Sequence, residues 1–429
     1  WQVSGSDDEF FEPSRSRLQH RNLLPESEGW DPGRIQPDLD ALILGMHARK
    51  DNPELIKAKE LGLKIFSFPE FIYEQTRHKT RIVIGGSHGK TTITSMIMHV
   101  LKHHHIPFNY LVGAQLEGFE TMVDVSPEPD IAVIEGDEYL SSPIDPRPKF
   151  HLYQPHIAVI SGIAWDHMNV FPSFENYQQQ FVKFAGSLSK NGKLFYYGND
   201  PNITEWIGKT DDHYEAIPYF TPQYTVLNGN CFLLERSKKL PLQIFGKHNM
   251  QNLEAARRVC KEAGITDEAF IEAIQSFKGA SRRLQLLGKK NNTRVYLDFA
   301  HAPSKLKASL EAVAEQHPEK KLVACIELHT FSSLNKDFLP QYAHTMDRAD
   351  EAIVFYNLHN FEKKQLPPFS PKEIKKAFNR KDLLVLHEPD VLESYLKNRD
   401  LSNTVLLLMS SGDFSGLDIQ NMTDNLLAK

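Results

Sequence analysis

From residue 289 onward, short apolar runs alternate regularly with helix-like stretches. The predicted strands cover 293–301, 321–328, 351–356, 382–388 and 403–410. The predicted helices between them cover 305–317, 338–349, 371–378 and 391–399. This alternation predicts an α/β fold with a doubly wound parallel sheet. Ligands of such sheets bind beyond the carboxyl ends of the strands, and Asp298 and His301 lie at the carboxyl end of the first strand.

Two further α/β patterns precede this region. Strand-like runs at 39–45 and 63–68 flank a helical stretch, which predicts a small α/β unit at the start of the chain. The pattern restarts at Arg81 with predicted strands and helices that make a mixed α/β region, namely strands 81–85, 130–136, 156–162 and 193–198 and a helix over 174–188. A chain of 429 residues exceeds one comfortable hydrophobic core, so we predict three domains, 1–80, 81–287 and 288–429.

The composition is that of an ordinary soluble protein, with 41% hydrophobic and 24% charged residues and no apolar run long enough to span a membrane. A net charge of -6 lacks the general basic footprint of a nucleic-acid binder. The three cysteines are far apart and lack C-x-x-C spacing, so we expect neither disulfides nor a zinc site, and a cytoplasmic location. The strand-like start "WQVSGSD" has nothing before it to pair with, which predicts that an upstream segment is missing.

A strand, a glycine loop and a helix follow one another at 81–101. Residues 85–101 read GGSHGKTTITSMIMHVL, and Ile84 stands where the full G-x-x-x-x-G-K-[ST] pattern has its first glycine. The glycines allow a tight turn whose N–H groups face a phosphate, and the helix adds its positive dipole end. Lys90 is then placed to bridge phosphate oxygens, and Thr91 to bind Mg²⁺. Nucleotide binding is the favoured interpretation, and a structural glycine turn is the alternative.

Acidic and histidine side chains follow two predicted strands of the middle region. Glu135, Asp137 and Glu138 end one buried strand, and Asp166 and His167 follow another. Carboxylates at the end of a strand suit magnesium or an amine. Solvated loop charges and a structural histidine are the alternatives. We predict that the two groups together form a metal site.

Amide and arginine side chains complete the set of candidate residues. Asn249 and Asn252 lie one helical turn apart, so both amides share a face and suit the edge of a nucleotide base, with helix capping as the alternative. Of the adjacent Arg282 and Arg283, one is expected to reach phosphate oxygens while the other makes a surface ion pair.

Taken in order, these motifs resemble those of the Mur ligase family of peptidoglycan synthesis. They read G-x-H-G-K-T-T at 86–92, E-x-D-E-Y at 135–139, D-H at 166–167, H-N-x-x-N at 248–252, R-R-L at 282–284 and D-F-A-H-x-P at 298–303. The likeness spans nearly the whole chain, and Gly136 stands where alanine is usual. It implies three domains: an N-terminal Rossmann-like domain, a central P-loop ATPase domain and a C-terminal doubly wound Rossmann-like domain.

Within the family, residues 135–171 look like the branch that attaches a murein tripeptide, because D-x-R-x-K-F at 145–150 lengthens the interval before D-H. The resemblance implies an ADP-forming amide ligase that uses ATP and Mg²⁺. It would join L-Ala-γ-D-Glu-meso-diaminopimelate to UDP-N-acetylmuramate through an acyl phosphate. One alternative is a UDP-N-acetylmuramate:L-alanine ligase, and another is a nucleotide-binding homologue that has lost activity, motivated by the altered segment before Asp166.

The resemblance also implies a role for each matching residue. The catalytic residues would be Lys90, Glu135, His167 and Arg283. The ATP site would comprise Gly86, Ser87, His88, Gly89, Lys90, Thr91, Thr92, Asn249, Asn252, Arg283 and Asp298. Magnesium would be held by Thr91, Glu135 and His167. The uridine nucleotide would lie near Ser4, Gly5, Ser6 and Asp7, and the incoming peptide near His301, Ser410 and Ser411. ATP would then lie between the last two domains, so that their closure assembles the site.

Overall fold

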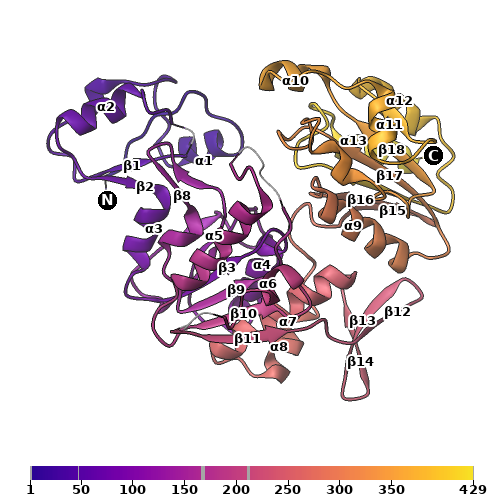
Figure 1. Cartoon of the computed structure of the whole chain (residues 1–429), viewed down its shortest axis with the longest axis horizontal. Coiled ribbons are helices and arrows are strands. Elements are labelled where there is room, and N and C mark those ends of the chain that lie inside the picture. Colours follow the sequence, from indigo (N-terminus) through magenta and orange to yellow (C-terminus); the bar gives the residue numbers. More distant parts are fainter. Residues whose placement is uncertain (1, 47, 166–169, 210–212, 429) are drawn as a thin grey trace.

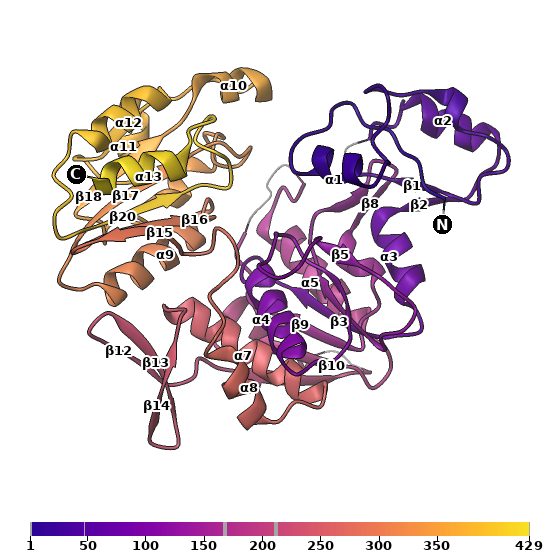
Figure 2. The ribbon, with the colours of Figure 1, turned by 180° about the vertical axis from the view of Figure 1, so that it is seen from behind.

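The computed structural model describes residues 2–46, 48–165, 170–209 and 213–428. Three units follow one another along the chain, and the magenta middle unit lies between the indigo first unit and the orange to yellow last unit (Figures 1 and 2). Over the described ranges, the helices are too short or too polar to traverse a lipid bilayer.

The first unit is small and holds a two-stranded parallel sheet. Its elements are α1 (Ser14–His20), η1 (Pro32–Arg34), β1 (Leu42–Leu44), α2 (Pro53–Glu60), β2 (Ile65–Ser67) and α3 (Phe68–Thr76). The predicted strands at 39–45 and 63–68 are therefore confirmed as β1 and β2. The expected strand at the start is wrong over residues 2–7, because the backbone there makes isolated bonds, such as Gly29 N–H to Asp7 O, instead of a ladder.

The middle unit is built on a seven-stranded sheet in the order β11-β10-β9-β3-β6-β4-β5, in which only β5 runs antiparallel to its neighbour. The elements up to β9 are β3 (Thr80–Gly85), α4 (Lys90–His103), β4 (Asn109–Leu111), β5 (Val123–Asp124), β6 (Ile131–Glu135), β7 (Leu140–Ser142), β8 (Asp145–Pro148), η2 (Lys149–Leu152) and β9 (Ile157–Ile160). The rest are α5 (Phe174–Gly186), β10 (Lys193–Tyr197), α6 (Pro201–Thr204), β11 (Glu215–Tyr219), β12 (Tyr224–Leu227), β13 (Asn230–Glu235), β14 (Lys238–Leu242), α7 (Lys247–Glu262) and α8 (Asp267–Ile274).

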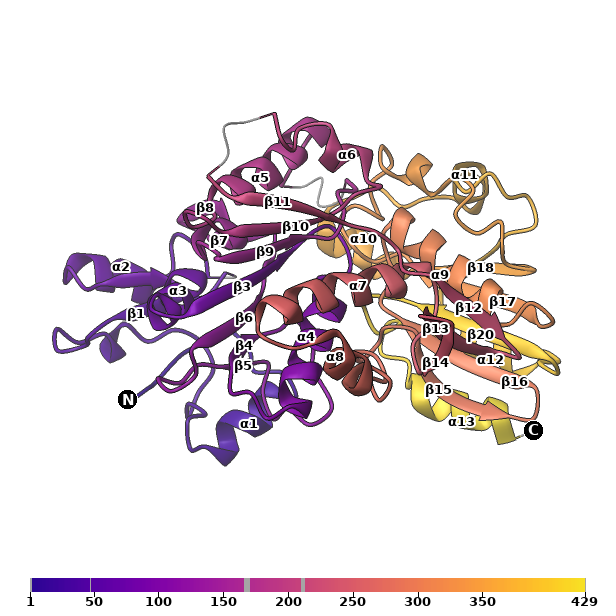
Figure 3. The same ribbon diagram turned by 90° about the horizontal axis from the view of Figure 1, so that it is seen from below.

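Both faces of this sheet are covered by helices. Figure 3 shows α5 and α6 on one face and α4, α7 and α8 on the other. The strand residues alternate accordingly, since Ile82 and Ile84 pack with α4 and α7 while Val83 packs with α5. Burial on both faces explains why these strands read as continuous apolar runs in the sequence.

The last unit confirms the predicted doubly wound parallel sheet. Its strand order is β15-β16-β20-β17-β18-β19, with β15 antiparallel to β16 and the others parallel. The elements are β15 (Gln285–Lys290), β16 (Thr293–Asp298), α9 (Pro303–Gln316), β17 (Lys321–Glu327), η3 (Leu339–Tyr342), β18 (Glu351–Phe355), α10 (Leu358–Lys364), α11 (Pro371–Ala377), β19 (Leu384–Leu386), α12 (Pro389–Lys397), β20 (Thr404–Met409) and α13 (Ile419–Ala428).

One predicted helix of the last unit is wrong. Residues 338–349 contain only the short 3₁₀ helix η3 followed by turns. The chain leaves the helical region at Ala343, where ψ is 131°, and His344 has a positive φ of 62°. The buried Tyr342 donates its hydroxyl to the carbonyl of His301, so a tertiary contact holds the chain in this shape.

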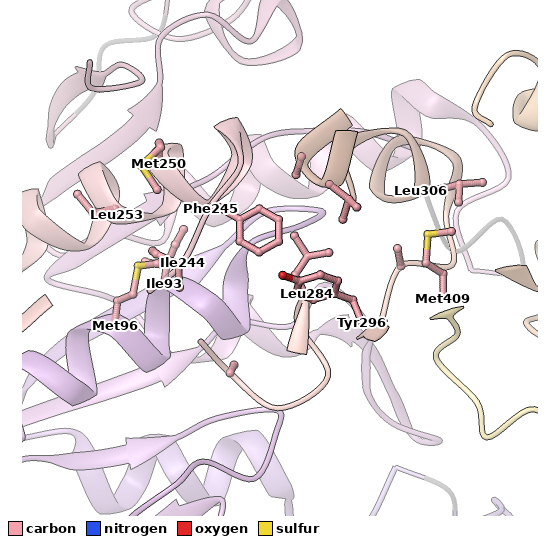
Figure 4. Packing of buried hydrophobic residues seen from close by; sticks show 14 of the residues in the cluster. Ile93, Met96, Ile244, Phe245, Met250, Leu253, Leu284, Tyr296, Leu306 and Met409 are labelled. Atoms are coloured by element: carbon pink, nitrogen blue, oxygen red, sulfur yellow. The ribbon is translucent and has the colours of Figure 1, made fainter. Parts of the chain in front are cut away.

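The middle and last units share a hydrophobic core. Figure 4 shows Phe245 lying between α7 and the start of the last unit, near Leu284 and Tyr296. The rings of Phe245 and Tyr296 meet edge to face with centroids 5.6 Å apart. On the same side, the Tyr224 hydroxyl of β12 donates to Glu315 of α9 at 2.9 Å. The two units are therefore joined by buried apolar contacts as well as by the chain itself.

This junction predicts a dependence of stability on pH. The half-buried His317 accepts from or donates to the Tyr296 hydroxyl at 3.0 Å, and burial, with nearby Arg294 and Lys320, lowers the pKa of His317 to about 4. In the unfolded chain this histidine takes up its proton near the ordinary pKa of about 6.5, whereas in the folded protein it does so only near 4. Protonation therefore favours the unfolded chain, and stability falls as the pH drops from about 6.5 toward 4. We expect the urea midpoint to fall less between pH 7 and pH 5 in His317→Gln than in the wild type. Equal losses would contradict a neutral His317, and His20→Gln, an exposed site, is the control.

Candidate active site

A cavity of about 670 Å³ lies where the glycine loop meets the last unit. Its lining comes from the loop after β3, the ends of β6 and β16, the start of α7, the segment between α8 and β15, and α9. Of the residues assigned to ATP from the sequence, the cavity is lined by Ser87, His88, Gly89, Lys90, Thr91, Thr92, Asn249, Asn252, Arg283 and Asp298. The structure thus brings these residues together from four separate segments of the chain.

The glycine loop has a backbone that only glycine fits at two positions. Gly86 has φ 130°, and a Cβ there would overlap the Ser161 hydroxyl and lie 2.9 Å from the Ser161 nitrogen. Gly89 has φ 82°, and a Cβ there would lie 3.2 Å from Cγ of Asn252. The two glycines therefore let the loop approach β9 and α7 closely. The loop ends directly in α4, whose first turn faces the cavity.

The basic side chains of the loop differ in charge. Lys90 donates to the Gly86 carbonyl at 2.8 Å and to Glu138 at 2.5 Å. Burial opposes its charge, but the neighbouring carboxylates of Glu138 and Asp137 outweigh it and raise the pKa of Lys90. Burial instead lowers the pKa of His88 to about 4, and the charges of Lys305 and Lys90 act in the same direction. The loop therefore offers a phosphate one permanent positive charge and a neutral imidazole.

Thr91 and Glu135 fit a magnesium ion. The Thr91 hydroxyl lies 2.9 Å from Oε1 of Glu135, close to the roughly 3.0 Å that separates adjacent ligands around an octahedral Mg²⁺. Burial raises the pKa of Glu135, and a bound cation would lower it again by stabilising the charged carboxylate. Among the described residues, no cluster of three acidic, histidine or cysteine side chains is arranged for a metal. The predicted ligand His167 and its neighbour Asp166 lie outside the described residues.

The three carboxylates predicted after β6 have separate partners. Glu135 also accepts the Gly113 N–H at 2.7 Å, Asp137 pairs with Lys149 at 2.8 Å, and Glu138 pairs with Lys90. They are therefore not simply solvated loop charges. Gly136 between them has no room for the usual alanine, since a Cβ would lie 2.8 Å from Cγ1 of Val83.

The two asparagines of α7 are buried at the edge of the cavity. Asn249 donates its amide to the Phe245 carbonyl at 2.9 Å, whereas Asn252 packs against Gly89 of the loop. Both lie in the first two turns of α7, on the face expected from their spacing. Their proposed contact with adenine stays a prediction.

The adjacent arginines connect the cavity with the last unit. Arg283 lies 4.3 Å from the ring centre of Phe299 and 3.5 Å from the Thr91 hydroxyl. Arg282, expected to form a surface pair, instead donates to the backbone carbonyls of Ser410 and Gly412. The expected surface ion pair is therefore wrong, because the turn with φ 55° at Arg282 directs its guanidinium toward the loop after β20. Asp298 accepts the Leu284 N–H at 3.0 Å and so fixes the end of this turn.

The candidate substrate residues lie in two places. His301 lines the cavity, whereas Ser410 and Ser411 do not, and the buried Ser410 hydroxyl donates to Glu327. Ser4, Gly5, Ser6 and Asp7 lie in the first unit, away from the cavity lining. There the Ser6 hydroxyl donates to Glu54 at 2.7 Å and the Gly5 carbonyl accepts from Arg34 at 2.8 Å. A uridine-nucleotide site at Ser4 to Asp7 stays a prediction.

Several lining residues were not singled out from the sequence. Lys149, His248 and Lys305 all line the cavity. His248 stands inside the H-N-x-x-N motif and Lys305 follows D-F-A-H-x-P by two residues, so motif position was an available signal for both. Lys149 had a weaker signal, as the lysine of the D-x-R-x-K-F segment.

Two family models match the chain. The Mur ligase middle domain matches residues 84–260, and the glutamate ligase domain of Mur ligases matches residues 282–412. A UDP-N-acetylmuramate--L-alanine ligase from Caldicellulosiruptor bescii is 32% identical over 370 residues, covering 82% of this chain and 77% of that protein.

Solved structures share the fold along the whole chain. A murein peptide ligase from Psychrobacter arcticus matches with a TM-score of 0.66 and 20% identity, covering 100% of this chain and 94% of that one. A UDP-N-acetylmuramate-alanine ligase from Thermotoga maritima matches with a TM-score of 0.70 and 20% identity, covering 99% and 92%. With the glycine loop, the acidic strand end and the two matching domains in place, the chain belongs to the Mur ligase family, whose members are ATP-dependent amide ligases.

Proposed function

We propose that the protein activates the carboxyl group of UDP-N-acetylmuramate with ATP and transfers the acyl group to L-alanine. The observation that carries the ATP chemistry is the convergence of Lys90, the Thr91–Glu135 pair and Arg283 on one cavity. L-Alanine as the acceptor is supported by the relatives similar over most of the chain, which are named L-alanine ligases. This reverses the preference for the tripeptide that the sequence motifs alone favour.

In the proposed first step, a carboxylate oxygen of the muramate attacks the γ-phosphorus of ATP. The bond to ADP breaks and an acyl phosphate forms. Such a transfer depends on positioning and on neutralising charge, which Lys90 of the glycine loop and Arg283 of the segment between α8 and β15 would supply. Mg²⁺, held by Thr91 and Glu135, would neutralise further phosphate charge.

In the proposed second step, the acceptor amine attacks the acyl carbon. The carbon–oxygen bond to phosphate then breaks, an amide forms, and the proton of the amine leaves with the phosphate. His301, at the end of the segment after β16, is on the side of the cavity from which an acceptor held by the last unit would approach. Water must be kept from the acyl phosphate, which is the usual purpose of domain closure over such a site.

The murein tripeptide is the second candidate acceptor. The segment that distinguishes the tripeptide branch forms β8 and the start of η2, and its Lys149 lines the cavity beside Asp137. A free carboxylate of a longer acceptor would find a cation there. This observation favours the tripeptide as acceptor, whereas the relatives are named L-alanine ligases.

A single assay separates the candidates. The full chain is incubated with ATP, Mg²⁺, UDP-N-acetylmuramate and either L-alanine or L-Ala-γ-D-Glu-meso-diaminopimelate, and ADP formation is followed. We expect ADP only with L-alanine. ADP only with the tripeptide would establish the second candidate, and no ADP with either would indicate a homologue without ligase activity.

Two predictions from the sequence accompany this proposal. The domain limits 1–80, 81–287 and 288–429 stay a prediction, to be checked by limited proteolysis at the boundaries. A cytoplasmic location also stays a prediction, and it agrees with the use of ATP and a nucleotide sugar.

A further inference from the structure

Glu138 is fully buried and contacts Lys90 at the end of the glycine loop. One of its carboxylate oxygens accepts from Lys90 at 2.5 Å, and the other lies 3.1 Å from the hydroxyl of Tyr177 on α5. Burying a carboxylate is costly unless it is paired and hydrogen-bonded, and these two contacts help to meet that cost. The pair with Lys90 is therefore a buried, hydrogen-bonded ion pair in the folded protein.

Tyr177 extends this contact back to the glycine loop. Its hydroxyl lies 2.9 Å from the Ser87 hydroxyl, which accepts the N–H of Ala164 at 2.9 Å. A carboxylate only accepts hydrogen bonds, so the Tyr177 hydroxyl is the donor toward Glu138, and it is also directed toward the Ser87 oxygen. One continuous path thus runs from the loop through α5 and Glu138 to the ammonium group of Lys90.

The hydrogen bonds of Lys90 determine how many of its N–H groups can point into the cavity. An ammonium group has three N–H donors. In the described part of the chain, Lys90 gives one to the Gly86 carbonyl and one to Glu138, which leaves one for the cavity that Lys90 lines. A lysine stem is flexible, so an ammonium held in advance loses less conformational freedom when phosphate arrives.

We propose that Glu138 and Tyr177 are positioning residues that hold the ammonium of Lys90 in place for the phosphates of ATP. This inference rests on the proposed function, because it takes Lys90 to contact ATP. The same carboxylate is a negative charge near the phosphates. Glu138 therefore weakens ATP binding slightly while it speeds phosphoryl transfer, and this opposition distinguishes positioning from a merely structural ion pair.

The test uses Glu138→Gln and Tyr177→Phe in the full chain, with kcat and KM for ATP measured in the ligase assay and Mg-ADP affinity measured by calorimetry. Glu138→Gln keeps the shape and removes the charge, so we expect kcat to fall by about tenfold or more while Mg-ADP binds as tightly as before or more tightly. Tyr177→Phe removes one hydroxyl, and kcat should fall by about threefold to tenfold with unchanged affinity.

Tyr73→Phe is the matched control, because the Tyr73 hydroxyl bonds to Gln154 outside the cavity lining. Its kcat should stay within about twofold of the wild type. A kcat within twofold in the Glu138 and Tyr177 variants, or a loss of affinity equal to the loss of kcat, would overturn the inference. If Glu138→Gln does not fold, Tyr177→Phe decides alone. A wild type that forms no ADP with either acceptor would instead overturn the proposed function and this inference with it.

Discussion

Lys90→Ala is expected to lower acceptor-dependent ADP formation by about a hundredfold to a thousandfold. Lys90 supplies the positive charge of the glycine loop, and Glu138 and Asp137 raise its pKa, so it is charged at neutral pH. Removing it leaves Glu138 buried without its cation and the phosphates without a clamp. The measurement is initial-rate ADP formation at saturating ATP and acceptor.

Lys183→Ala is the control for this variant. Lys183 is exposed on α5, and its loss should leave the rate unchanged. A Lys90→Ala protein that is folded by circular dichroism and retains more than a tenth of the wild-type rate would show that Lys90 does not bind the phosphates.

Gly86→Ala is expected to abolish nucleotide binding and to destabilise the protein by about 1–3 kcal/mol. At φ 130° an alanine is strained, and its Cβ would meet both the hydroxyl and the backbone of Ser161. Ser161 donates to the carbonyls of Gly85 and His88, so moving Ser161 disturbs the loop on both sides of Gly86. Calorimetric titration with Mg-ATP and a thermal unfolding scan would measure the two effects.

Gly186→Ala provides a matched glycine. Gly186 is the last residue of α5, it has no atoms near the position of a Cβ, and its φ is not positive. We expect wild-type affinity and stability from this variant. If Gly86→Ala bound Mg-ATP as well as Gly186→Ala, the close approach of the loop to β9 would not matter for the nucleotide.

The sequence predicted the sheet units well because their strands are buried on both faces. The runs at 321–328 and 403–410 stand out as continuous apolar segments, and both form central strands of the last sheet. The failure at 338–349 has a different origin. Its composition suits a helix, but the contact of Tyr342 with His301 and the turn at His344 come from distant parts of the chain, which a local pattern does not contain.

The candidate site also contains residues that the sequence pattern could predict and residues that it could not. The glycine loop and the Thr91–Glu135 contact could be expected, since the loop follows β3, Glu135 ends the neighbouring parallel strand β6, and these two strand ends lie side by side. Tyr177 could not, because it lies on an amphipathic helix with Phe181 and Phe184 and reads as an ordinary core residue. The partners of Arg282 could not be predicted because they lie beyond residue 400, in the loop that follows the central strand β20.

The shared core at Phe245 and Tyr296 limits how the last unit can move over the cavity. Separating the two units would expose large aromatic surfaces to water, so a rotation about this apolar contact is the less costly motion. Such a pivot would keep the same apolar area buried before and after closure. Nucleotide-driven closure should therefore bring charged walls together with only a small change in heat capacity, unlike the closure of two domains connected by a bare linker.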